Sequence, residues 1–218
     1  MSTIVLLRHA RSTANGDGVL AGRASGVTLD ETGAEQAGLA AERLAGIDFA
    51  AVVSSPLERC QQTAAAVTAM PLHLDERFTE CDYGEWSGRP LTELASEPLW
   101  AAIQAKPSEV HFPNGERMAD MRERVVAGVA DWDARLGEDA TWLLVSHGDL
   151  IKTVLSHALG QDFDDFQRIL IDPASISVVR WAQPRPHVVT MNSHAGLMAP
   201  LLGASGGGPQ LGGEQGPA

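Results

Sequence analysis

The sequence has few cysteines, few basic residues and only short apolar runs, and each shortage excludes a class of protein. Its 218 residues include only two cysteines, Cys60 and Cys81, which predicts reduced thiols in a cytoplasmic protein rather than a disulfide scaffold. Sixteen Lys and Arg stand against 28 Asp and Glu, and a net charge of -12 lacks the basic footprint that nucleic-acid binding needs. Apolar runs such as residues 4–7 fall far short of the roughly 20 residues that span a bilayer, and no secretory leader is visible. We therefore expect no nucleic acid and no membrane among its partners.

The apolar segments alternate with helical patterns along the chain. Four of them are predicted as strands: residues 4–7, which have no polar alternation and are typical of a buried strand, and residues 51–54, 72–74 and 141–146. Helical patterns fall at residues 32–44, 56–69, 118–136 and 149–159. Residues 175–181 and 187–191 suit a closing antiparallel pair. This alternation predicts an α/β fold, a three-layer α/β/α sandwich with a largely parallel central sheet.

Local signals refine the helix ends and the domain limits. Thr32 and Ser55 each open a capping-box pattern, and Pro56 suits the first position of a helix. Residues 15–29 read as a loop, and the irregular stretch 90–113 reads as short helices in an insertion. With no linker or repeat in sight, residues 1–198 are expected to form one domain, followed by a disordered Gly- and Pro-rich tail at 199–218.

Charged side chains follow three of the predicted buried strands directly. Arg8 and His9 follow the first strand, Arg59 lies one helical turn beyond the second, and His147 follows the strand at 141–146. The carboxyl ends of parallel strands line the crevice in which open α/β sheets bind ligands. We therefore expect two arginines and two histidines to meet at one edge of the sheet.

These residue types suit phosphoryl transfer. Two guanidinium forks match the oxygens of a phosphoryl group, and a neutral imidazole is a competent nucleophile toward phosphorus. A second imidazole can donate to the phosphoryl oxygens in the transition state. The reaction also needs an acid for the leaving oxygen, for which Glu80 is the first candidate and Asp82 and Glu85 are alternatives. A carboxyl group between apolar walls and a phosphate can have its pKa raised enough to stay protonated.

Five motifs, in this order, resemble those of the histidine phosphatase superfamily, also called the phosphoglycerate mutase-like family, and of its phosphatase branch. They cover about three quarters of the chain, and any one alone would be a weak signal. The motifs are R-H-x-x-S/T-x-x-N at residues 8–15, L-x-x-x-G-x-x-Q-A at 29–37, S-S-P-L-x-R-x-x-x-T-A at 54–64, E-x-x-x-G-x-W-x-G at 80–88 and S-H-G at 146–148.

The resemblance implies roles for individual residues. His9 would become phosphorylated and Glu80 would be the proton donor, with no metal and no cofactor. The residues expected to bind the phosphoryl group and the substrate are Arg8, Ser12, Asn15, Gly22, Arg59 and His147.

The chain departs from the family pattern at three positions. Ala10 stands where the family usually has glycine, so this position is not expected to need a positive φ, and a methyl group must fit there. Arg11 follows, where an acidic residue or Gln is common, and Arg117 replaces the serine of a G-E-S motif. Both arginines are extra cations that an anionic arm of the substrate could use.

Two other phosphate and metal chemistries fit the sequence poorly. A cysteine phosphatase needs an arginine six residues after its cysteine, where this chain has Ala66 and Ser87. The remaining histidines lack the H-E-x-x-H and H-x-x-E-H spacings of zinc enzymes, and the acidic run 162–165 reads as a helix start or a solvated turn.

The sequence therefore predicts a metal-independent phosphatase that hydrolyses phosphomonoesters of small metabolites through a phosphohistidine on His9. A phosphoglycerate mutase is the alternative, disfavoured because residues 80–88 look more like the phosphatase branches. A catalytically silent domain that binds phosphorylated ligands is a third hypothesis, although neither the nucleophile nor a pocket arginine is lost. Specificity is expected in residues 20–23 and 89–117, the substrate is not named by the sequence, and a homodimer is left open.

Overall fold

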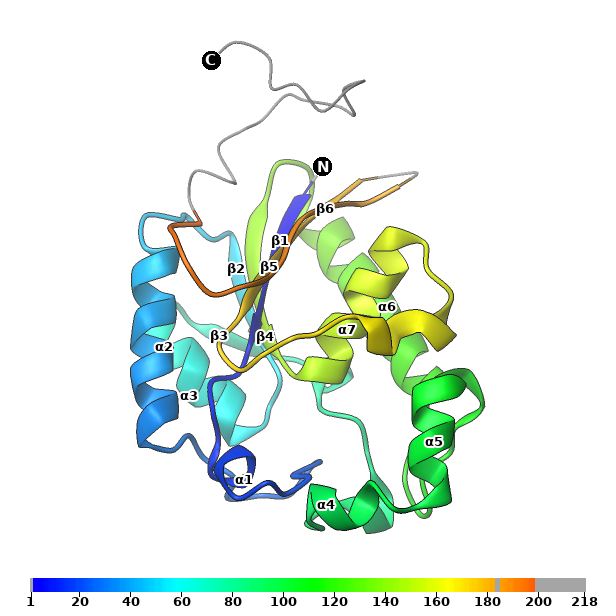
Figure 1. Cartoon of the computed structure of the whole chain (residues 1–218). Helices are drawn as coiled ribbons and strands as arrows, with labels where there is room; N and C mark the ends of the chain where they lie inside the picture. The colour runs from blue at the N-terminus through cyan, green and yellow to red at the C-terminus, as the bar shows by residue number, and fades with distance from the viewer. Residues whose placement is uncertain (1, 183–184, 199–218) are drawn as a thin grey trace.

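The computed structural model describes residues 2–182 and 185–198, which are built around one six-stranded sheet (Figure 1). The strand order is β3–β2–β4–β1–β5–β6. Strands β1, β2, β3 and β4 pair in parallel, whereas β5 and β6 join antiparallel at one edge. The strands are β1 Ser2–Arg8, β2 Ala51–Ser54, β3 Leu72–Leu74, β4 Thr141–Ser146, β5 Ile176–Trp181 and β6 His187–Ser193.

Helices cover both faces of this sheet, with α2 and α3 on one side and α6 and α7 on the other (Figure 1). Three short helices lie beyond the carboxyl ends of the parallel strands, at the bottom of the view in Figure 1. The longer helices are α2 Glu31–Leu44, α3 Glu58–Val67, α6 Met118–Leu136 and α7 Gly148–Leu159, and the short ones are α1 Thr13–Gly16, α4 Leu91–Leu94 and α5 Pro98–Ala105.

The central strand β1 divides its apolar side chains between the two helical layers. Val5 and Leu7 pack with residues of α2 and α3, whereas Ile4 and Leu6 pack with residues of α6 and α7. Successive residues of a strand point to opposite faces, so an unbroken apolar run is what a strand covered on both sides requires. The predicted three-layer α/β/α sandwich with a largely parallel sheet is confirmed.

The register of the parallel strands sets the position of the site. Arg8 lies opposite Ser146 on β4, and Ser54 on β2 lies opposite Val145. The amide of His9 donates to the carbonyl of Ser146 at 2.9 Å, which continues the ladder one residue past the end of β1. The segments that follow β1, β2 and β4 therefore leave the sheet side by side at its carboxyl edge.

Two helix starts differ from the predicted ones. The cap of α2 is Asp30, whose carboxylate accepts from the amide of Gly33 at 2.7 Å, so Thr32 lies inside the helix. Helix α3 begins at Glu58 without a side-chain cap, and the hydroxyl of Ser55 instead accepts from the amide of Leu57, before the helix, at 3.3 Å. The predicted loop at 15–29 also overlaps a helical turn, α1.

No helix among the described residues is both long and apolar enough to cross a membrane. The expected tail at 199–218 lies outside the described residues, so the domain limits of 1–198 and 199–218 stay a prediction.

Candidate active site

A cavity of about 280 Å³ lies at the carboxyl ends of the parallel strands, between the sheet and helices α4 and α5. Its lining joins Arg8 and His9 at the end of β1 to Arg59 on α3 and Glu80 on the chain that follows β3. Four of the predicted site residues, distant in sequence, thus face one space. Ser12, Asn15 and Gly22 line it as well.

His9 is held in one tautomer. Its Nδ1 lies 2.8 Å from the carbonyl oxygen of Ala10, which can only accept a hydrogen bond, so Nδ1 carries the proton. Arg59 donates through Nε to the other ring nitrogen, Nε2, at 3.3 Å. The lone pair of His9 is therefore on Nε2, the atom a nucleophilic imidazole would use.

The charge state of His9 follows from its surroundings. Only 3% of the residue is exposed, and burial lowers the pKa of His9 well below its ordinary value, with the positive charges of Arg8 and Arg59 adding to the effect. His9 is thus a neutral imidazole throughout the physiological range.

The two arginines beside His9 have buried donors without protein acceptors. Arg8 donates through Nη1 to the carbonyl of Ile171 at 2.6 Å, and Arg59 donates through Nη2 to the carbonyl of Gly22 at 2.9 Å. Among the described residues, neither Nε of Arg8 nor Nη1 of Arg59 has a hydrogen-bond partner. Unpaired buried donors are costly, and their clustering beside a cavity is what an anion site requires.

His147 lies behind Arg59. Its Nδ1 accepts from Nη2 of Arg59 at 3.2 Å, and its Nε2 then donates to the hydroxyl of Ser55 at 2.8 Å. The residue is fully buried, and burial lowers the pKa of His147 well below its ordinary value, with Arg59 as the largest charge contribution. The described lining of the cavity does not include His147, which contacts the cavity through Arg59.

Glu80 is a carboxyl group whose pKa lies close to neutral pH. Burial raises its pKa to about 7, and the negative charge of Asp149 contributes in the same direction, against the lowering effect of Arg59. Its Oε1 accepts from the amide of Cys81 at 3.0 Å, and its Oε2 lies 3.7 Å from Nδ1 of His147. Near pH 7 this group can either give or take a proton.

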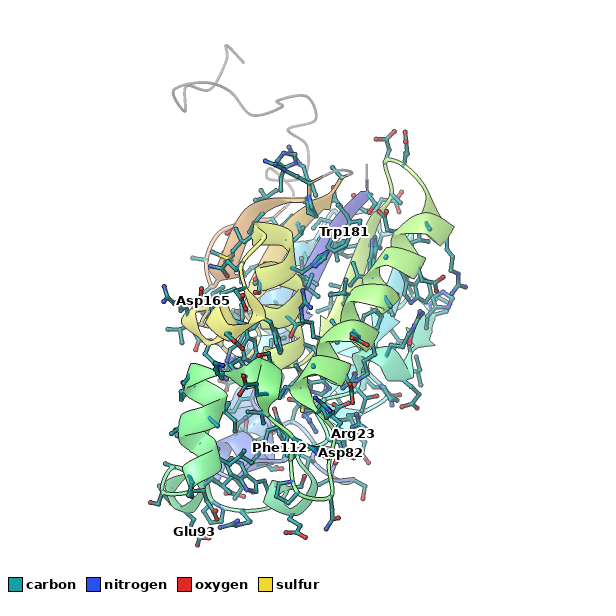
Figure 2. The ribbon with its side chains drawn as sticks, turned by 90° about the vertical axis from the view of Figure 1, so that its right-hand side faces the viewer. Arg23, Asp82, Glu93, Phe112, Asp165 and Trp181 are labelled. Atoms are coloured by element: carbon teal, nitrogen blue, oxygen red, sulfur yellow. The ribbon has the colours of Figure 1, made fainter. Side chains whose placement is uncertain are left out.

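Two arginines and a glutamate fix the backbone at Glu80. The carbonyl of Glu80 accepts from Nε of Arg23 at 2.8 Å and from Nη2 of Arg124 at 3.3 Å. Glu116 bridges both arginines, at 3.2 Å from Arg23 and 2.6 Å from Arg124, and also accepts from the amide of Asp82 at 2.9 Å. Arg23 also lies beside Asp82, with 3.8 Å between its Nη1 and the carboxylate (Figure 2). The segment that carries Glu80 is therefore anchored to α6.

The first turn after β1 adds a neutral polar edge. Ser12 caps α1 and accepts from the amide of Asn15 at 3.3 Å, and Oδ1 of Asn15 accepts from the amide of Ser12 at 3.1 Å. Both residues line the cavity. Ala10 has no positive φ, and its methyl group packs with Ala37 and Ala174, as its departure from glycine led us to expect.

The two extra arginines do not reach the cavity. Nε of Arg11 pairs with Asp30 at 3.0 Å, toward the start of α2. Arg117 is exposed and precedes α6. Neither side chain is part of the cavity lining, so the expected contact with an anionic arm of the substrate is wrong for this geometry.

Three functional side chains escaped the sequence reasoning. Ser55 was expected to cap a helix and instead holds His147. Asp149 follows the S-H-G motif directly, and the hydroxyl of Tyr83 donates to it at 3.0 Å beside Glu80. The position of Asp149 one residue past a strand-end motif was the signal that could have found it. The described residues hold no group of three or more His, Cys, Asp or Glu placed for a metal ion.

Comparison with known proteins supplies the family. A family model described as the histidine phosphatase superfamily, branch 1, matches residues 4–194. The chain belongs to the histidine phosphatase superfamily. The resemblance drawn from the five motifs is confirmed by this match.

Named relatives within the superfamily include phosphatases. A bifunctional protein of Mycobacterium tuberculosis is 33% identical over 192 residues, 82% of this chain and 50% of that protein, so the chain spans about half the length of that relative. Phosphoserine phosphatase 1 of Hydrogenobacter thermophilus is 29% identical over 201 residues, 88% of this chain and 92% of that one. The crystal structure of the alpha-ribazole phosphatase from Shigella flexneri matches with a TM-score of 0.78 and 26% identity, covering 88% of this chain and 96% of that one.

Proposed function

We propose that the protein hydrolyses phosphomonoesters of small metabolites through a phosphohistidine on His9, without a metal ion. The observation that carries the proposal is the pair of contacts on the His9 ring. Nδ1 is fixed by Ala10, and Nε2 carries its lone pair beside the unpaired donors of Arg8 and Arg59. A nucleophile and an anion pocket therefore share one space.

The first step transfers the phosphoryl group to the enzyme. Nε2 of His9 attacks phosphorus, a P–N bond forms, and the P–O bond to the substrate alcohol breaks. Arg8 and Arg59 stabilise the charge that spreads over the phosphoryl oxygens, and His147 holds Arg59 in place. Glu80 gives its proton to the departing oxygen and becomes a carboxylate.

The second step restores the enzyme. The carboxylate of Glu80 takes a proton from water, the water oxygen attacks phosphorus, and the P–N bond breaks with the pair returning to Nε2 of His9. The products are the alcohol and inorganic phosphate. The pKa of about 7 at Glu80 suits this exchange of roles, because acid and base forms are both accessible near neutrality. The amide donors of Asn15, the hydroxyl of Ser12 and the Gly22 segment complete the binding edge.

Trapping the intermediate tests the mechanism. Enzyme mixed with a radiolabelled alkyl phosphate and quenched in alkaline detergent is expected to carry label that survives alkali and is lost in acid. The label should be absent from His9→Ala. Turnover by the wild type without any trapped label would overturn the phosphohistidine.

A phosphoglycerate mutase is the second candidate, because a relative 30% identical over 188 residues is named a probable phosphoglycerate mutase. In that reaction the phosphoryl group returns to the sugar acid instead of to water. Conversion of 3-phosphoglycerate to 2-phosphoglycerate without release of inorganic phosphate would favour it. A silent binding domain is excluded if any alkyl phosphate is hydrolysed by the wild type and not by His9→Ala.

We also propose a cytoplasmic location for this reaction. Both cysteines are free and buried, as suits a reducing compartment.

A further inference from the structure

The cavity has a second wall, opposite in character to its phosphate end. The protein contains five Trp, five Phe and one Tyr, a low share for its length. Four of these rings line the cavity: Tyr83, Trp86, Trp100 and Phe112. Trp100 and Phe112 come from residues 89–117, where the sequence led us to expect specificity, whereas Tyr83 and Trp86 belong to the motif at 80–88. No step proposed above uses these rings.

The rings form one continuous cluster that starts beside the acid and ends at α5. Tyr83 meets Phe112 edge-on at 5.0 Å between ring centroids, and Phe112, which is buried, meets Trp86 at 5.7 Å. Trp86 and Trp100 lie stacked, with ring planes 20° apart and centroids 6.4 Å apart. Rings at such spacings attract one another and offer edges and faces to a further ring.

Aliphatic side chains complete this wall. Leu20, Leu91 and Ile103 line the same cavity, and Leu91 and Trp100 are partly open to solvent. Together with the four rings they form an apolar surface, which favours a leaving group that buries apolar area.

The charges along the cavity disfavour a second anion on the substrate. After Arg8 and Arg59, the only other cation among the described lining residues is Lys152. Its ammonium is already held by Asp149 at 3.2 Å and by Gln167 at 2.9 Å. Because Asp149 adds negative charge nearby, a carboxylate on the leaving group would meet repulsion there, while the one further cation is already paired.

The size of the cavity limits the leaving group. A cavity of about 150 Å³ holds one benzene ring. The cavity of about 280 Å³ therefore has room for a phosphoryl group together with one ring.

We infer that the substrate is the phosphomonoester of an uncharged alcohol that carries an aromatic ring, with the ring held by Trp86, Trp100 and Phe112. The inference rests on the proposed function, since it assigns the leaving group of that reaction. It separates this protein from enzymes whose substrates are small phosphorylated acids.

Three alkyl phosphates with similar leaving oxygens test the wall. We expect kcat/KM for 2-phenylethyl phosphate to exceed that for ethyl phosphate by about 30-fold or more, because the phenyl group buries apolar surface. The kcat/KM for carboxymethyl phosphate should be lower than that for ethyl phosphate. Equal values for the phenyl and ethyl esters, or a preference for the carboxylate, would overturn the inference while leaving phosphatase activity intact.

Variants of Trp100 show whether the ring wall is responsible. Trp100→Ala should lower the phenylethyl-to-ethyl ratio about 10-fold, and Trp100→Phe should restore most of it. Trp100→Lys should raise kcat/KM for carboxymethyl phosphate relative to that for ethyl phosphate, because lysine supplies a cation for the carboxylate. Leu39→Ala, at a 59% exposed position on α2, is the control and should keep the wild-type ratio. An unchanged ratio in Trp100→Ala would count against the wall.

A binding measurement keeps the two proposals apart. The phosphonates of the same groups cannot be hydrolysed, so their Kd values by calorimetry do not depend on turnover. Tighter binding of 2-phenylethylphosphonate than of ethylphosphonate, with no hydrolysis of any ester, would support the ring site and reject the phosphatase. Equal Kd values together with equal kcat/KM would reject the ring site alone.

Discussion

Arg59 donates to Nε2 of His9 across 3.3 Å, so the atom that would attack phosphorus already faces the cation that would stabilise the phosphoryl group. The contact has two effects at once. It holds the ring in one orientation, and its positive charge adds to burial and to the charge of Arg8 in lowering the pKa of His9. Arg59, from another segment, thus contributes both to the nucleophile and to the anion pocket.

Arg59→Lys should separate these effects. Lysine keeps the charge but loses the planar fork that contacts His9, His147 and Gly22 together. We expect kcat/KM to fall roughly 100-fold or more, with the circular dichroism spectrum unchanged. Arg89→Lys, in an exposed pair with Glu97, is the matched control and should keep near wild-type activity. Full activity in Arg59→Lys would contradict the fork as the clamp.

The pH dependence of kcat reports Glu80. With its pKa raised to about 7, the carboxyl is protonated below that pH and is lost as leaving-group acid above it. We therefore expect kcat for an alkyl phosphate to decline as pH rises through about 7. No ascending limb is expected near 6.5, because His9 is already neutral there. Glu80→Gln should remove the decline along with most of the rate. A flat wild-type profile from pH 5 to 9 would argue against Glu80.

The raised pKa of Glu80 also predicts a stability effect. The folded state holds a proton that the unfolded chain releases at its ordinary, lower pKa, so stability falls as pH rises between the two values and is lowest above about 7. Glu80→Gln keeps the shape without the charge. It should match the wild type near pH 4 and exceed it by roughly 1–3 kcal/mol at pH 8. Urea unfolding at both pH values measures this, and equal stabilities at pH 8 would show that ionised Glu80 is well solvated.

The elements that local pattern specifies were predictable. Helix α6 has the bounds Met118–Leu136 expected from its apolar spacing, because every third or fourth side chain enters one core. The strand predicted at 141–146 has the observed bounds of β4, and the run predicted at 4–7 lies within β1 Ser2–Arg8, because a strand covered on both faces shows an unbroken apolar run.

The remainder depends on contacts between distant residues. Ser55 has the local pattern of a helix cap, but His147 from β4's end competes for its hydroxyl. From the sequence, Arg11 could have been a cation for the substrate, but in the fold it pairs with Asp30. The ring wall likewise arises from short irregular segments whose order says nothing about which rings meet. Sequence patterns therefore predicted which side chains meet at the strand ends, whereas the contacts among the rings needed the fold.

The ion pairs of Glu116 should contribute to the free energy of unfolding and hold the backbone that carries Glu80. Its carboxylate holds Arg124 and Arg23, which both donate to the carbonyl of Glu80. Glu116→Ala leaves these donors partly unsatisfied in a half-buried site and should cost about 2–3 kcal/mol of unfolding free energy. Glu109→Ala removes an exposed pair with Lys106 and should cost well under 1 kcal/mol. Chemical unfolding measures the free energy of both variants. Similar losses of unfolding free energy would mean that the Glu116 bridge contributes no more than a surface ion pair.

Ser55 offers a test of positioning that leaves the reacting groups intact. Its hydroxyl accepts from Nε2 of His147 at 2.8 Å, which leaves Nδ1 as the acceptor for Arg59. In Ser55→Ala the imidazole loses this partner and can adopt the other tautomer, whose protonated Nδ1 would oppose Arg59. We expect kcat to fall about 10-fold with a smaller change in KM, because the clamp is displaced most where charge develops. Ser55→Thr keeps a hydroxyl and should recover most of the rate. A purely structural role would instead lower the thermal stability of Ser55→Ala while leaving kcat of the folded fraction at the wild-type value.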